Sequence, residues 1–281
     1  MIERLRITVL ADDYVAAPDL LAEHGLSILI EADDWRILFD TGQGEVLRVN
    51  ADALGVSLYP LDAVVLSHGH YDHTGGLAGL LQEVSPSAIF LHPTALHQKY
   101  AKSESPPHRS IGMPESSRQA LDAVQNQIVW TRSATEVVPS VWCTGEIPRV
   151  PANGSSEAGF FLDGDCREPD SLTDDQTFFI ETRNGIVVIA GCAHAGVANT
   201  LDRVSALTGC GEVLAVIGGL HLWRATPPQL ETSANAVSGR KTRILAPCHC
   251  TGMGARSYLR GRFHSLVRDV GAGTQLVLDE L

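Results

Sequence analysis

The segment SHGHYDHTGG at residues 67–76 constrains this chain most, because it places three histidines and an aspartate within six positions. It follows a β-branched apolar run at residues 61–66, which predicts a buried strand. Since side chains alternate along a strand, His68 and His70 are expected to share one face at its end and to hold one ion. Asp72 and His73 lie in the turn beyond and can face a second ion. Burying these four groups together without a cation would leave unpaired charge. The alternative is that each histidine is separately a packed or surface residue, in which case no metal is needed.

Other apolar runs also end in residues that can bind metals. These residues are Asp40, Cys192, His194, His221 and His249. Imidazole and carboxylate mixtures suit zinc, iron or manganese. We therefore predict two divalent metal ions, with zinc as the first choice.

The apolar patterns predict a mixed α/β (α+β) chain. Pairs of runs separated by short turns suit hairpins, and runs with a helical period follow several of the strands. Strands are expected at Arg4–Ala11, Leu26–Glu31, Trp35–Asp40, Leu61–Leu66, Ala88–Leu91, Gln176–Glu181, Gly185–Ala190, Glu212–Ile217, Thr242–Ala246 and Gln275–Leu278. Helices are expected at Glu45–Leu54, Gly76–Val84, around Val197–Val204, around Gln229–Ser238 and at Ala255–Val270.

The stretch from about residue 94 to residue 175 is less regular. Residues 103–110, 151–159 and 166–175 are rich in Pro, Ser, Gly and charge. We expect a loop-rich insertion here, with a few strands and a lid, because long loops in a compact domain tend to be functional.

Charge and hydropathy exclude several function classes. The chain has 21 Lys and Arg against 33 Asp and Glu, a formal net charge of −12, which argues against a broad grip on nucleic acid or anionic lipid. The longest apolar stretch, Val213–Trp223, is short of the ~18 residues that a membrane span needs. Charges interrupt the first apolar segment, so we expect no signal peptide, a cytoplasmic location and reduced cysteines.

The motif H-x-H-x-D-H after a strand resembles that of the metallo-β-lactamase-fold hydrolase superfamily, and LFDTG at residues 38–42 resembles the strand end before it. The set SHGHYDHTGG, TGEIPR, GCAHAG, GGLHL and HCTG resembles a narrower subfamily that includes a dihydropterin–ribofuranosylaminobenzene phosphate synthase of methanopterin biosynthesis. The resemblance covers almost the full chain. It implies one domain over residues 1–281: an αββα sandwich of two mixed sheets with helices on the outer faces and a dinuclear site at one sheet edge.

The resemblance assigns most ligands directly. His68 and His70 match the ligands of the first metal, and Asp72, His73 and His249 those of the second. Two departures stand out: WCTGEIPR carries no histidine where many members have one, and Cys192 stands where a metal-bridging Asp is common. His194 is the best substitute for the missing ligand, and Cys192 is either a thiolate ligand or a small buried residue.

Other residues near these motifs have less certain roles. Asp40 is best interpreted as an acceptor that orients a ligand imidazole. His221 is either an acid or substrate contact over the metals or a core histidine. Cys248 and Cys250 flank His249, so both are expected to point away from it and to pack. The remaining histidines are expected at the surface or in packing, namely His24, His92, His97, His108 and His264.

A metal pair can activate water near neutral pH, so the resemblance implies a hydrolase of an ester or phosphodiester, with Asp72 orienting the nucleophile. Arg149, Arg224 and Arg256 are candidates for binding an anionic small-molecule substrate, and the glycine turn before Arg256 either offers N–H groups to an anion or is merely tight. Two alternatives stay open: a transferase that joins a dihydropterin methyl pyrophosphate to an aminobenzene ribotide, and a metal-bound sensor without turnover. The sequence does not give the oligomeric state.

Overall fold

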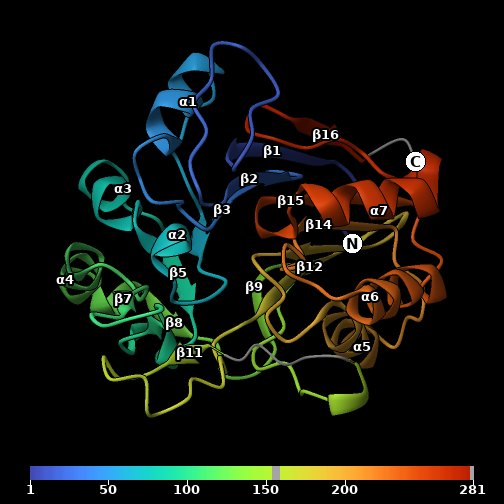
Figure 1. The fold of residues 1–281 in the computed structure, drawn as a ribbon. Helices are drawn as coiled ribbons and strands as arrows, with labels where there is room; N and C mark the ends of the chain where they lie inside the picture. The colour runs from blue at the N-terminus through green and yellow to red at the C-terminus, as the bar shows by residue number, and fades with distance from the viewer. Residues whose placement is uncertain (154–158, 279–281) are drawn as a thin grey trace.

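The computed structural model describes residues 1–153 and 159–278, and its frame is two facing β-sheets (Figure 1). The first sheet has seven strands in the order β16-β1-β2-β3-β4-β5-β8. Its strands are β1 (Leu5–Ala11), β2 (Ser27–Ala32), β3 (Trp35–Phe39), β4 (Ala63–Val65), β5 (Ala88–Leu91), β8 (Ile128–Trp130) and β16 (Gln275–Val277). Strands β3, β4, β5 and β8 run parallel, and the other neighbours pair antiparallel.

The second sheet has six strands in the order β15-β14-β13-β12-β10-β9. They are β9 (Thr135–Val138), β10 (Val141–Cys143), β12 (Thr177–Thr182), β13 (Gly185–Ala190), β14 (Ala215–Gly219) and β15 (Ile244–Cys248). β13, β14 and β15 are parallel, so their carboxyl ends meet at one edge. A small third sheet joins β6 (Tyr100–Ala101), β7 (Arg109–Ser110) and β11 (Phe160–Phe161).

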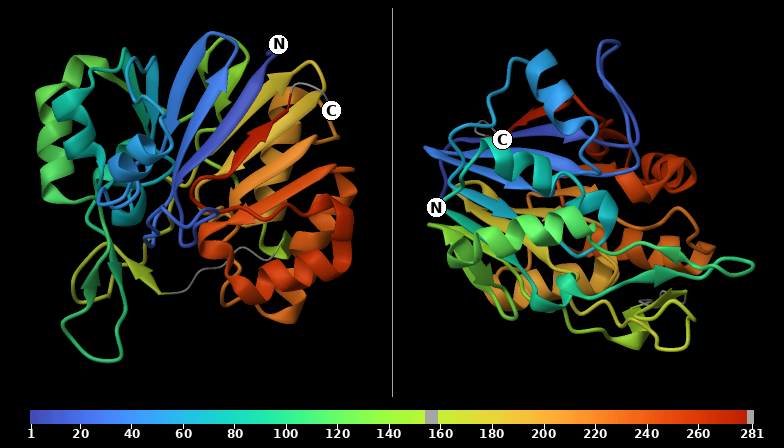
Figure 2. Two further views of the ribbon diagram at one scale, coloured as in Figure 1. Left: turned by 90° about the horizontal axis from the view of Figure 1, so that it is seen from above. Right: turned by 90° about the vertical axis from the view of Figure 1, so that its left-hand side faces the viewer.

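Helices cover both outer faces, which Figure 2 shows from above and from the side. On the first sheet lie α1 (Leu47–Ala53), α3 (Leu77–Glu83) and α4 (Glu115–Ala123), and on the second lie α5 (Val197–Thr208), α6 (Pro227–Gly239) and α7 (Met253–Phe263). Short helical turns fill the connections: α2 (Tyr71–Thr74), η1 (Pro93–Leu96), η2 (Gln125–Gln127), η3 (Pro151–Asn153), η4 (His249–Thr251) and η5 (His264–Leu266). The predicted αββα sandwich is confirmed.

Alternation along the strands builds the three apolar layers. In β2, Ile28 and Ile30 face the other sheet, while Leu29 packs under the helices. In β13, Val187 and Ile189 face inward and Val188 faces α5–α7. Both faces of each sheet are therefore apolar, which is why these runs lack the polar alternation of a half-exposed strand.

The segment from residue 94 to residue 175 is more ordered than expected. It holds α4, and it supplies β8 to the first sheet and β9 and β10 to the second. These strands have only three or four residues, too few for a periodic pattern to stand out. Loop structure is found at residues 103–108 and 166–176, while the expected loop at 151–159 falls mostly outside the described residues.

The last helix is shorter than expected, because α7 ends at Phe263 and not at Val270. His264 has φ +34°, and the chain then turns to run beside β15. There the N–H of Arg268 donates to the carbonyl of Leu245. This tertiary pairing replaces the helical continuation that the apolar spacing had suggested. Among the described residues, no helix is long and apolar enough to cross a bilayer.

Candidate dinuclear metal centre

Three histidines converge at the end of β4 and β13. His68 Nε2 lies 2.9 Å from His70 Nδ1 and 3.2 Å from His194 Nε2. All three side chains are buried. His68 and His70 come from one strand end of the first sheet, and His194 comes from the loop after β13 in the second. This is the set predicted for the first ion, including the substitute His194.

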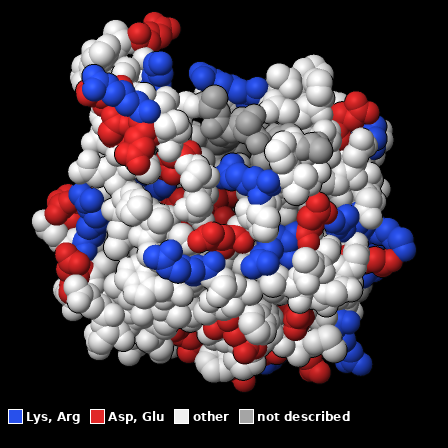
Figure 3. Space-filling model, turned by 90° about the horizontal axis from the view of Figure 1, so that it is seen from below, with Lys and Arg blue, Asp and Glu red and all other residues white. Residues whose placement is uncertain are grey.

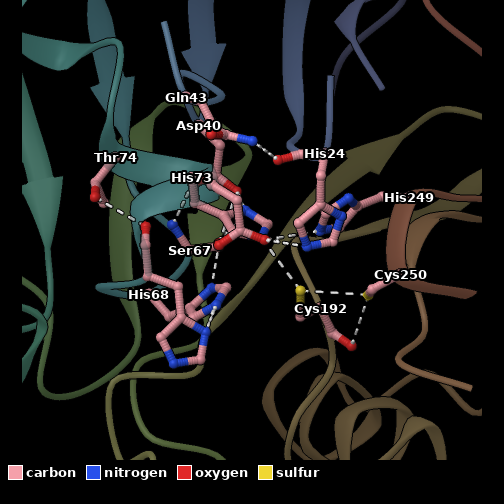
Figure 4. Close-up of polar contacts among 12 residues, drawn as sticks. His24, Asp40, Gln43, Ser67, His68, His73, Thr74, Cys192, His249 and Cys250 are labelled. Atoms are coloured by element: carbon pink, nitrogen blue, oxygen red, sulfur yellow. Dashed lines mark hydrogen bonds and ion pairs between the residues drawn. The ribbon is translucent and has the colours of Figure 1, made fainter. Parts of the chain in front are cut away.

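A second group forms around the carboxylate of Asp72. Its Oδ2 atom lies 3.5 Å from His249 Nε2 and 3.8 Å from His73 Nε2. Asp72 and His73 lie in α2, the short turn that follows His70, and His249 follows β15. The predicted second set therefore also comes together, from opposite sheets (Figure 4).

Cys192 lies between the two groups. Its Sγ is 3.2 Å from His73 Nε2, and it lies within 4.8 Å of ligand atoms of His68 and His194 on one side and of His73 and His249 on the other. A sulfur that reaches both groups occupies the place of a bridging ligand. Of the two roles expected for Cys192, the geometry favours the thiolate ligand.

The donor set suits divalent ions on its own chemistry. Imidazole nitrogens face each other in a buried space, and His70 Nε2 and His249 Nε2 make no hydrogen bond within the described part of the chain. Burial, with the neighbouring imidazoles, holds the pKa of His68 and His70 well below the ordinary value, so both stay neutral. Burial alone would raise the pKa of Asp72, but His73 and His249 outweigh it and hold that pKa low. The neutral imidazoles of His68 and His70 and the ionised carboxylate of Asp72 are in the state that Zn²⁺ requires. Burial would lower the pKa of His249, but Cys250, Asp13 and Asp72 outweigh it and raise that pKa, so His249 must lose a proton when it binds an ion.

Asp40 holds the ring of His73, one of the candidate ligands, in place. Its Oδ2 lies 2.6 Å from His73 Nδ1, and its Oδ1 accepts the N–H of Ser67 at 2.7 Å. The hydroxyl of Ser67 also donates to Asp40 and lies 2.9 Å from His68 Nδ1. A Cβ at Gly191 would lie 2.1 Å from Ser67 Oγ, so only glycine lets the second sheet approach this network.

Three residues that the sequence analysis did not assign also reach the centre. Asp12 and Asp13 follow β1, and Asp13 Oδ1 lies 2.7 Å from His249 Nδ1 while Asp12 Oδ1 accepts the N–H of His249. Burial raises the pKa of Asp12 to about 6. His24, expected at the surface, is half-exposed yet places Nε2 3.3 Å from Asp72 Oδ2. The signal for Asp12 and Asp13 was present, since they end an apolar run as Asp40 does.

A buried ion-pair network lies next to the turn that carries the candidate ligands His68 and His70. Lys99 Nζ donates to Asp174 Oδ1 at 2.9 Å and to Asp170 Oδ2 at 2.6 Å. Asp174 Oδ2 accepts the N–H of Gly69, between His68 and His70, at 2.7 Å. Burial would lower the pKa of Lys99, but the two carboxylates outweigh it and raise that pKa. The loop at 166–175 is thereby tied to the ligand turn.

The centre opens into a cavity of about 950 Å³. Arg224 lines it, as predicted for a substrate contact, together with Lys102 and Arg109, which come from the segment expected to be loops. On the face in Figure 3, basic and acidic side chains alternate without forming one broad basic surface. The aromatic residues Tyr14, Tyr71, Phe160 and Trp223 also line the cavity.

The predictions for Arg149 and Arg256 need correction. Arg149 donates to the carbonyls of His194 and Leu172, so it braces the His194 loop. Arg256 donates to the carbonyl of Val270 and lies over the Tyr14 ring, and neither arginine lines the cavity. Sequence alone cannot tell a guanidinium that binds substrate from one that satisfies backbone carbonyls.

His221 and Cys250 both lie beside the centre. The His221 ring centroid is 4.5 Å from that of His194, and the residue lines the cavity. Cys250 was expected to pack away from His249, but its Sγ lies 3.3 Å from Cys192 Sγ. Strand alternation does not apply here, because β15 ends at Cys248 and His249 turns with φ +47°. Cys248 does pack between the sheets, as expected.

Comparison with known proteins decides the family. A family model described as the metallo-beta-lactamase superfamily matches residues 21–204. The chain belongs to the metallo-β-lactamase superfamily. Members of this superfamily include the solved structure of a metal-dependent hydrolase that shares 30% identity, covers 97% of this chain and 98% of its own, and superposes with a TM-score of 0.79.

Two curated relatives of this metallo-β-lactamase-fold chain come from Methanocaldococcus jannaschii. A 7,8-dihydropterin-6-methyl-4-(β-D-ribofuranosyl)-aminobenzene-5'-phosphate synthase is 27% identical over 97% of this chain and 96% of its own length. An uncharacterised protein is 30% identical over 88% of this chain and 91% of its own. The relatives thus span nearly the whole chain.

The position of Cys192 gives a direct prediction. Cys192→Ser should reduce any metal-dependent activity and metal content more than Cys248→Ser, because Cys192 Sγ reaches both ligand groups whereas Cys248 packs between the sheets. Both variants make the same chemical change in a buried, free thiol, so they differ in the position of the sulfur and not in the kind of substitution. Steady-state rates and elemental analysis of both variants test it. A larger loss in Cys248→Ser would contradict this placing of the site.

Proposed function

We propose that this protein is a dinuclear metal-dependent hydrolase that cleaves an ester or phosphodiester of a small, anionic molecule. The observation that carries the proposal is the convergence of two buried ligand groups on Cys192, at the floor of a cavity. Two divalent ions, with zinc as the first choice, would be held by His68, His70 and His194 and by Asp72, His73 and His249. When bound, such ions supply Lewis acidity and lower the pKa of water.

The chain's own groups can bind and orient the substrate. Lys102, Arg109 and Arg224 line the cavity and suit an anionic group. Phe160 lies against the His70 and His194 rings, with centroids 5.3 and 5.6 Å away, and would exclude water from that side. We assign the proton transfers to two groups that line the same cavity.

Asp72 and His221 are those groups. The Asp72 carboxylate is ionised and lies at the cavity floor, where it can orient the attacking nucleophile. The half-buried His221 lies beside His194 and can give a proton to the leaving oxygen or contact the substrate. A general acid of this kind must reach the leaving group directly or through one water, which its place on the cavity wall allows.

Transfer is the second candidate, because the synthase relative matches this chain over nearly its full length. In that reaction an aminobenzene ribotide would form a bond to the methyl carbon of a dihydropterin methyl pyrophosphate and give up a proton. The bond from that carbon to the diphosphate oxygen would break, and pyrophosphate would leave as a free product. The roomy cavity and its aromatic lining could accept two ring systems, and the same cations would hold the leaving group.

One paired assay separates these candidates. The purified protein, loaded with Zn²⁺, is offered a panel of esters and phosphodiesters, and separately the pterin pyrophosphate with its ribotide acceptor. We expect hydrolysis products that disappear in Asp72→Asn. Release of pyrophosphate with a coupled product and no hydrolysis would favour transfer. Metal and ligand binding with no turnover in either assay would contradict both reactions and leave a ligand sensor.

A further inference from the structure

Cys192, Cys250 and His221 form a sulfur-rich cluster beside the predicted ligand groups. Their ligand atoms all lie within 4.8 Å of one another, and the two sulfurs are 3.3 Å apart. Cys250 and His221 belong to neither set assigned above. The three come from the ends of three parallel strands, β13, β14 and β15.

The backbone around the cluster is shaped to admit the second sulfur. A Cβ at Gly219 would lie 2.8 Å from Cys250 Sγ, so the glycine leaves the space that this sulfur fills. The N–H of His221 donates to Cys250 Sγ at 3.3 Å, and His221 turns with φ +47° at the strand end. The motifs GGLHL and HCTG are therefore fitted to each other at this point.

The cluster faces the cavity. Cys192, Cys250 and His221 all line it, whereas His68 and His73 do not. An ion that enters from solvent reaches this cluster before it reaches the deepest imidazoles. Cys192 is shared with the group that contains His73 and His249.

We propose that Cys192, Cys250 and His221 form a further cation site, open to the cavity, that takes a thiophilic ion such as Zn²⁺ or Cd²⁺. Two thiolates and an imidazole are the soft and borderline ligands that these ions prefer, and the cavity leaves a position for solvent or an exchanging ligand. Because Cys192 also belongs to the deeper group, an ion held here is one ligand exchange from His73 and His249.

Cadmium titration of the reduced, metal-free chain tests the site. Thiolate-to-cadmium absorbance in the ultraviolet and the cadmium NMR shift both report how many sulfurs bind an ion. The wild type should show a cadmium bound by two sulfurs, and Cys250→Ser should lose part of the absorbance and move the resonance to the single-sulfur range. Cys248→Ser, whose thiol packs between the sheets, should match the wild type.

The second variant guards against a folding defect at Cys250. His221→Gln changes a half-buried side chain, and it should keep the two-sulfur spectrum while releasing cadmium faster to a competing chelator. A Cys250→Ser or His221→Gln chain that behaves as the wild type would overturn the site. Isolation of the native chain as a Cys192–Cys250 disulfide would also overturn it, by assigning the pair to redox chemistry. Because the experiment measures bound cadmium, its result does not depend on whether the protein catalyses the proposed hydrolysis.

Discussion

Replacing His70 or His249 by alanine should lower the metal content below two ions per chain. Each change leaves one group with two ligands of its own beside the Cys192 sulfur, which both groups share, whereas catalytic zinc sites ordinarily keep three protein ligands each. Both side chains are buried and present a nitrogen that makes no hydrogen bond in the described part of the chain. The expected result is loss of about one ion from the affected group in each variant. Elemental analysis after dialysis measures it.

His97→Ala is the matched control, because His97 is exposed and lies outside both groups. It should retain the full metal content. If His70→Ala and His249→Ala were both fully occupied, the ligand assignment would be refuted. A loss in only one of them would show which of the two groups holds an ion.

Lys99→Met should destabilise the fold by about 3–5 kcal/mol, because removing one partner of a buried ion pair leaves uncompensated charge. Here two carboxylates, Asp170 and Asp174, would lose their shared cation, and both are almost fully buried. Asp174 also holds the N–H of Gly69, so the ligand turn should loosen as well. Chemical denaturation gives the free energy of unfolding.

Lys102→Met makes the same substitution at an exposed lysine three positions away, and should change stability by less than about 0.5 kcal/mol. Metal affinity of Lys99→Met, measured against a chelator, should fall with the loss of Asp174's support. Equal unfolding free energies for the two variants would show that the network contributes little.

Local sequence patterns predicted the mixed strands and helices and the metal-binding cluster at residues 68–73, while the αββα sandwich and the assignment of His194 and His249 came from the family resemblance. Three histidines and an aspartate stand together after one strand, and the other ligands each end an apolar run. Sequence reasoning missed His24 and Cys250, whose roles depend on how distant segments fold back. His24 is brought to Asp72 by the loop between β1 and β2. Arg149 shows the reverse error, since its basic side chain suggested a ligand contact but satisfies two carbonyls.

The surface position expected for His24 was partly right. Its side chain is about half exposed (51%), but the contact with Asp72 was missed. Short strands such as β8 and β10 were missed for lack of length, because three residues cannot display a period. Pairing of β8 with β5 and of β10 with β9 and β12, which the sequence cannot show, stabilises them.

The ligand groups draw on both sheets. His68 and His70 follow a strand of the first sheet, and His194 follows a strand of the second. In the other group, Asp72 comes from the first sheet's side and His249 follows a strand of the second. Each ion would therefore crosslink the amino-terminal and carboxyl-terminal halves of the chain. Stripping the ions should let hydrogen exchange accelerate first along this seam, at the open ends of β4 and β13, well before the layers beneath the helices are exposed.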